Sequence, residues 1–168
     1  MRELYIKQKV LKITDHYPIT DADQNPVYQV DEEFRFIKKK LHVSRPNGEK
    51  IFEIEKQISF LRPRFVVTFA DGKQLEIRSK LTLFKKEIDI DPDELQLTLK
   101  GDFWDHSFSL YRGGQEIGKI QKKWLSWGDN YQLSIAAPEY EILFVAVVLA
   151  VDMILDDEQA AAAASSSN

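Results

Sequence analysis

The sequence predicts a mainly β protein, a closed antiparallel β-barrel of about twelve strands that encloses a hydrophobic C-terminal α-helix. Strand-like segments and tight turns follow one another from Tyr5 to Ile135, at the spacing typical of all-β sandwiches and barrels. The stretch Pro138–Leu155 is apolar on every side when it is drawn as a helix, so protein must surround it. A closed barrel covers such a helix and leaves no sheet edge exposed.

The helix prediction rests on the length of this stretch and on its first turn. Four valines between Val145 and Val151 favour a strand, but the stretch is longer than the roughly 3–10 residues of most strands. Pro138 suits a first helical position, and Glu139 and Glu141 suit the positive end of the helix dipole. A helix packed outside a β-sandwich would leave one apolar stripe in water, so the barrel is favoured.

The first half of the chain is predicted as strands joined by turns. His16–Pro26 is rich in Asp, Asn and Pro and is expected to be a connection. Asn47–Gly48 is the strongest short hairpin signal. The strands expected around them are Tyr5–Ile13, Val27–Val30, Phe34–Val43 and Ile51–Glu55.

The second half continues the series up to the helix. Hairpin turns are predicted at Asp71–Gly72, Gly113–Gly114 and Gly128–Asn130. The expected strands are Phe65–Phe69, Leu75–Ser79, Leu81–Ile90, Leu95–Leu99, Phe108–Tyr111, Ile117–Ile120, Trp124–Trp127 and Tyr131–Ile135. Together the two halves give roughly ten to twelve strands, which is enough to close a barrel.

The 168 residues fit one domain, at 1–158, followed by a low-complexity tail at 159–168. The alanines of the tail are expected to extend the helix and its serines to be disordered, unless the tail is in part a remnant of expression cloning. Asp156, Asp157 and Glu158 suit the negative end of the helix dipole badly, so they are expected in solvent.

The composition excludes several classes of function. Without cysteine there are no disulfides, thiolate metal sites or cysteine nucleophiles. A net charge of −4 gives no overall attraction to nucleic acid, and we find no recognition helix or stacking platform. The first thirteen residues lack the apolar core of a signal peptide. The apolar run Ile142–Val151 is about half of a membrane-spanning helix, so no transmembrane segment and a cytoplasmic location are expected.

One segment carries a family resemblance. Ile117–Ile135 reads IGKIQKKWLSWGDNYQLSI and precedes an apolar helix that contains Asp152, in LFVAVVLAVDMI. With the succession of hairpins, this order resembles the LURP-one-related family over Met1–Asp157. That family shares the Tubby C-terminal-like fold with phospholipid scramblases. The resemblance implies a twelve-stranded barrel around a central C-terminal helix.

The resemblance implies little about activity. Bacterial and plant members mostly lack a defined biochemical activity. Tubby proteins bind phosphoinositides through basic residues, but those positions cannot be matched to residues of this chain, so none is carried over.

Enzyme chemistry has one weak candidate. Asp102, Asp105 and His106 would bind a metal if the fold supplied a further ligand, although a polar loop with an aromatic anchor is the favoured interpretation. There is no phosphate-binding glycine loop, nucleophile elbow or complete calcium loop. We therefore predict no catalytic residue and no cofactor, with an enzyme that uses a barrel-mouth site as the alternative. Asp152 is expected to be structural, bonded to strand backbone near the barrel mouth.

Basic clusters give the leading functional hypothesis. In a strand, Lys38 and Lys40 share one face and Lys39 points to the other. Exposed cations of this kind contact anionic lipid headgroups, although lysines facing water are also normal on a barrel. The candidate anionic-lipid contacts are Lys38, Lys40, Arg62, Arg64, Lys122 and Lys123. The function predicted is a non-catalytic binding or scaffold domain for an anionic phospholipid or a protein partner.

Overall fold

The computed structural model describes residues 1–7, 15–35, 38–58, 63–81, 86–126 and 128–167. Twelve strands are present in this part of the chain: β1 (Arg2–Lys7), β2 (His16–Thr20), β3 (Pro26–Arg35), β4 (Lys38–Ser44), β5 (Lys50–Gln57), β6 (Arg64–Phe69), β7 (Gln74–Leu81), β8 (Lys86–Asp91), β9 (Leu97–Asp102), β10 (Ser107–Arg112), β11 (Gln115–Leu125) and β12 (Gly128–Ile135). Short 3-10 turns, η1 (Asp93–Leu95) and η2 (Pro138–Tyr140), precede β9 and the helix α2 (Glu141–Ser166).

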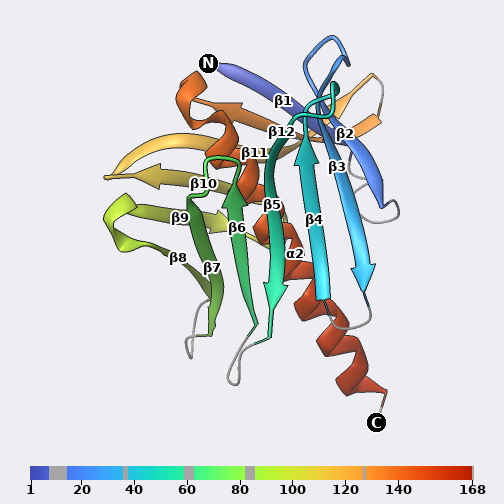
Figure 1. Ribbon diagram of the computed structural model, residues 1–168, viewed down its shortest axis with the longest axis vertical. Coiled ribbons are helices and arrows are strands. Elements are labelled where there is room, and N and C mark those ends of the chain that lie inside the picture. The colour runs from blue at the N-terminus through green and yellow to red at the C-terminus, as the bar shows by residue number, and fades with distance from the viewer. Residues whose placement is uncertain (8–14, 36–37, 59–62, 82–85, 127, 168) are drawn as a thin grey trace.

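The strands form one antiparallel sheet that rolls into a nearly closed barrel (Figure 1). Its order is β8-β7-β6-β5-β4-β3-β2-β1-β12-β11-β10-β9. All neighbours follow in sequence except β1 and β12, which pair with Leu4 opposite Leu133 and Ile6 opposite Tyr131. This pairing joins the first strand to the last, and the edges β8 and β9 lie close to each other across the remaining seam. The predicted barrel is confirmed.

The C-terminal helix runs through the barrel, as predicted. α2 contacts β5, β6 and β7 on one side and β11 and β12 on the other. Its residues 144–151 and 153–155 are buried, and they form one core with the inward side chains of the strands. Among the described residues, no helix has both the length and the apolar character needed to cross a membrane.

The prediction of a connection at His16–Pro26 was wrong over its first half. Residues His16–Thr20 form β2, in which Tyr17 and Ile19 are buried and their neighbours face outward. Pro18 argued against a strand because proline cannot donate to a sheet. It is tolerated here because β2 meets β1 at a single described pair, Tyr5 opposite Thr20.

The single strand predicted at Phe34–Val43 was also wrong. β3 ends at Arg35 and β4 begins at Lys38, and these two residues are paired across the two strands. The stretch contains no glycine, proline or asparagine to indicate a reversal. At three hairpins that carry glycine, Asn47–Gly48, Asp71–Gly72 and Gly113–Gly114, the glycines adopt the positive φ that these turns require.

The tail extends the helix further than predicted. α2 continues through the alanines, as expected, and includes Ser165 and Ser166, for which disorder was expected. Their hydroxyls donate to the carbonyls of Ala162 and Ala163 at 2.8 and 3.0 Å. Residues 159–167 are exposed, so the part of α2 that follows residue 158 projects beyond the barrel (Figure 1).

Candidate functional site

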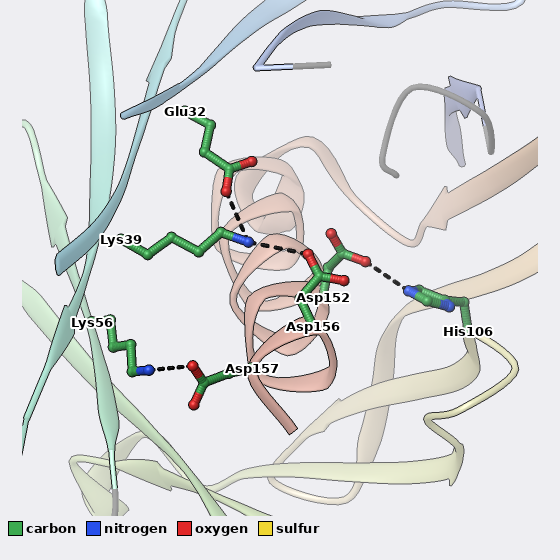
Figure 2. Close-up of polar contacts among 7 residues, drawn as sticks. All are labelled: Glu32, Lys39, Lys56, His106, Asp152, Asp156 and Asp157. Carbon is green, nitrogen blue, oxygen red and sulfur yellow. Dashed lines mark hydrogen bonds and ion pairs between the residues drawn. The ribbon is translucent and has the colours of Figure 1, made fainter. Parts of the chain in front are cut away.

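Two parts of α2 have different surroundings. Its middle, from Asp152 to Asp157, is surrounded by charged side chains that we call the ionic collar, and its first turn lines a cavity at the other end of the barrel. Figure 2 shows the ionic collar, which consists of Glu32, Lys39, Lys56, His106, Asp152, Asp156 and Asp157.

Lys39 is the centre of one half of the collar. Its Nζ lies 2.8 Å from Glu32 Oε1 on β3 and 3.1 Å from Asp156 Oδ2 on α2. Burial would lower the pKa of Lys39, but the hydrogen bonds and charges of Glu32 and Asp156 outweigh it and raise the pKa. Lys40, the next residue, faces the other way and lies 3.0 Å from Glu53, so the predicted alternation is confirmed for Lys39 and Lys40.

His106 and Asp152 form the other half of the collar. His106 Nε2 lies 2.9 Å from Asp152 Oδ1, and the two side chains are 12% and 13% exposed. The imidazole also stacks on the ring of Tyr131, with 4.6 Å between centroids. Burial raises the pKa of Asp152, although the hydrogen bond from His106 works in the opposite direction. The expected bond from Asp152 to strand backbone is replaced by this histidine contact.

The acidic end of the helix is tied to the strands. Asp157 pairs with Lys56 of β5, and Glu158 accepts a hydrogen bond of 2.6 Å from the hydroxyl of Ser79 on β7. Asp156 is bound to Lys39. The three carboxylates near the negative end of the helix dipole, where negative charge is unfavourable, therefore each have a partner on a different strand. The expectation that these acids lie free in solvent is therefore wrong.

The three candidate metal ligands each interact with a different partner. Asp105 pairs with Lys122, and Asp102 accepts a hydrogen bond of 3.2 Å from the backbone N–H of Asp105. His106 contacts Asp152. Within the described ranges, no group of three or more histidine, aspartate or glutamate side chains is placed to hold a metal ion.

At the opposite end of the barrel lies a cavity of about 790 Å³, which we call the mouth groove. It is enclosed by the β4–β5 and β6–β7 turns, the segment from Pro92 to Leu95, the end of β10 and the first turn of the helix. Its apolar lining includes Ile51, Phe69, Leu75, Leu95, Ile142 and Leu143, and its charged lining is Arg45, Glu49, Lys50, Asp71, Lys73, Arg112 and Glu139.

The charges of the mouth groove are unevenly paired. Lys73 lies 2.8 Å from Asp71. The Arg45 guanidinium lies 3.8 Å from Glu49 and 5.5 Å from the centroid of the Tyr28 ring. Two further cations line the same groove: Lys50 at the start of β5 and Arg112 at the end of β10. Both are exposed, and neither has a carboxylate partner in the part of the chain that the structure describes.

A buried carboxylate fixes the helix turn that forms one wall of the groove. Glu141 is 9% exposed. It pairs with Arg2 of β1 and accepts a hydrogen bond of 2.7 Å from the hydroxyl of Tyr28 on β3. Burial and this contact together raise the pKa of the Tyr28 phenol. The first turn of α2 is therefore held to two strands, which keeps Ile142 and Leu143 in place beside the groove.

The predicted lipid contacts are distributed over two regions of the sheet. Lys40 on β4 and Arg64 on β6 pair with Glu53 and with Glu76, the latter at 3.2 Å. Lys122 and Lys123 lie on β11, which β3, β2, β1 and β12 separate from β4. The described cations therefore do not gather in one place.

Two further residues of that hypothesis cannot be placed in full. Lys38 begins β4, and nothing is described of its side chain. Arg62 lies outside the described residues. Sequence reasoning missed the groove, although Lys50 and Arg112 each lie within three residues of a predicted hairpin turn, which was the available signal.

Comparisons with known proteins agree on one family. A family model described as LURP-one-related matches residues 2–152. The uncharacterized protein YxjI of Bacillus subtilis (strain 168) is 30% identical over 159 residues, which are 95% of this chain and 97% of that protein. Protein LURP-one-related 1 of Arabidopsis thaliana is 24% identical over 170 residues, 89% of this chain and 75% of that protein.

A solved structure supports the same fold. An X-ray structure of a protein from Arabidopsis thaliana superposes with a TM-score of 0.62 and covers 94% of this chain and 91% of that one. The identity is 16%, so this likeness concerns the fold alone.

Proposed function

The chain belongs to the LURP-one-related family, and we propose that it is a non-catalytic binding domain whose ligand is an anionic phospholipid. One observation carries the proposal. The barrel interior is filled by the protein's own helix, and the mouth groove is a large concave surface with apolar walls and two cations that lack carboxylate partners among the described residues. Apolar pockets with a few placed polar groups are typical of small-molecule sites.

The ionic collar supports a binding function over a catalytic one. A general acid or base needs a proton-exchanging group within reach of a substrate. In the collar, the acid and base groups are bound to each other between helix and strands, as His106 is to Asp152 and Lys39 to Glu32 and Asp156. Such pairing fits groups that hold the helix in the barrel.

Vesicle co-sedimentation tests the proposal. Phosphatidylcholine vesicles are compared with vesicles that contain increasing fractions of phosphatidylglycerol, at low and at physiological salt. We expect bound protein to increase with the anionic fraction and to decrease with salt, because surface charges are screened beyond about 8 Å at physiological ionic strength. Absence of binding at low salt would contradict the proposal and leave a protein partner as the ligand class to test.

A further inference from the structure

We propose that the mouth groove binds a single anionic phospholipid molecule, with an acyl chain along its apolar wall and its phosphodiester at Lys50 and Arg112. This inference rests on the proposed function and goes further. It names the site, and it places part of the lipid inside the protein rather than only against its surface.

The apolar wall of the mouth groove includes the part of the helix whose apolar side chains are not fully buried. From residue 144 to residue 155, every apolar side chain of α2 is buried. Ile142 and Leu143 are only partly buried, and the partly buried Phe69 and Leu95 line the same groove. Covering this surface with an acyl chain removes apolar area from water, which favours binding.

The charges select an anion. Arg45 and Lys73 are matched by Glu49 and Asp71, so they add no net charge. Lys50 and Arg112 remain, with Glu139 as the one further carboxylate of the lining. Two cations and one carboxylate leave a net charge of one positive unit, opposite to the single negative charge of a phosphodiester. Cations near an anionic headgroup attract it.

The size of the groove fits one molecule. Its volume of about 790 Å³ lies within the range of roughly 300–1,000 Å³ that is usual for small-molecule pockets. An extended peptide would need partners for its backbone N–H and C=O groups, which the apolar side chains of this wall do not supply. A lipid chain has no such requirement.

Monomeric short-chain lipids test the inference by isothermal titration calorimetry on the full chain. The probes are dihexanoylphosphatidylglycerol, its deacylated headgroup glycerophosphoglycerol, and dihexanoylphosphatidylcholine. We expect the first to bind and each of the others to bind at least about tenfold more weakly, because one lacks the chains and the other lacks the net charge. Equal binding of all three would overturn the inference.

Variants locate the site. Lys50→Glu/Arg112→Glu should weaken dihexanoylphosphatidylglycerol binding about tenfold or more, since both side chains are exposed and the fold should tolerate the change. Lys7→Glu/Lys119→Glu is the matched control, with the same change of net charge at exposed residues outside the groove. An equal effect of both pairs would overturn the site.

The vesicle experiment separates this inference from the proposed function. If anionic vesicles bind but the monomeric lipid does not, the groove site is overturned and the proposed function stands. If neither binds, both are overturned.

Discussion

The ring of Phe144 in α2 lies directly against the backbone of Gly118 in β11. A Cβ atom on Gly118 would be 2.5 Å from both Cγ and Cδ2 of that ring, well inside van der Waals contact. Phe144 is fully buried, so the helix meets the barrel wall at a position where the strand has no side chain. Close approach of this kind is a specific reason for glycine within a strand.

Gly118→Ala should therefore destabilise the protein. The added methyl group forces the Phe144 ring or the strand to move, and overpacking of this kind costs about 1–3 kcal/mol. Urea denaturation measures the free energy of unfolding. As a control, Phe144→Leu should reduce the cost of Gly118→Ala, because the smaller side chain leaves room for the methyl group. Unchanged stability of the single variant would contradict the packing described.

A carboxylate in the middle of the helix should unfold the protein. Ala146 and Val147 are fully buried, and burying an unpaired charge costs several kcal/mol against a typical stability of about 5–15 kcal/mol. Thermal melting of Ala146→Asp and Val147→Asp is the measurement. Ala162→Asp is the matched control, because it makes the same change on the exposed extension of α2. A melting point of the Val147 variant close to that of the control would show that this position is not in the core.

Asp152 should give the protein a specific dependence on pH. Because its pKa is raised in the folded state, the folded protein holds this proton more tightly than the unfolded chain. The resulting stabilisation is fully present below the unfolded pKa of about 3.9 and is lost as pH rises through the folded pKa. The groups facing Asp152 include His106, Asp156 and Lys39.

The comparison of wild type with Asp152→Asn isolates this effect. The asparagine keeps an oxygen that accepts a hydrogen bond from His106 but cannot titrate. Urea denaturation across acidic to neutral pH should show the wild type losing stability relative to the variant as pH rises above about 4. Parallel curves for the two proteins would mean that Asp152 keeps an ordinary pKa.

Two adjacent lysines provide a matched test of the ionic collar. Lys39→Met leaves Glu32 and Asp156 without their shared cation in a half-buried site, and we expect a loss of about 1–3 kcal/mol, the cost of leaving a buried polar group without its partner. Lys40→Met removes only the outward pair with Glu53, which should cost about 0–1 kcal/mol. Urea denaturation of both variants measures the difference. Equal losses would contradict a special role for Lys39.

Much of the fold could be predicted from local patterns, and the exceptions have physical reasons. The apolar helix follows from Ile142–Val151 alone, because no partner is needed to see that all its sides are apolar. β2 was missed because Pro18 is a local signal against a strand. Whether a strand tolerates a proline depends on how it pairs with its neighbour, which the local sequence does not show. The hairpin between Arg35 and Lys38 was missed because no turn residue marks it.

The sites depend on contacts between residues distant in sequence. Lys39 and Asp156 are 117 residues apart, so the sequence showed a basic cluster and an acidic cluster but not their pairing. The side chain of Lys39 was correctly predicted to point to the other face of the strand from that of Lys40, because the alternation of side chains along a strand is a local property. The mouth groove joins the β4–β5 and β6–β7 turns, the segment from Pro92 to Leu95 and the end of β10 to the first turn of the helix. Only the rolled barrel brings these segments together.

The last prediction separates the groove from the basic clusters as the membrane contact. Lys40 already pairs with Glu53 and Lys122 with Asp105, whereas Lys50 and Arg112 have no carboxylate partner among the described residues. Vesicle co-sedimentation at low salt should therefore be weakened more by Lys50→Glu/Arg112→Glu than by Lys38→Glu/Lys40→Glu or Lys122→Glu/Lys123→Glu. All three double variants change the net charge by the same amount. A general electrostatic effect of about 1 kcal/mol per cation would therefore weaken vesicle binding equally in all three. A dominant effect of the Lys38 and Lys40 pair would instead place the contact on the outer face of β4.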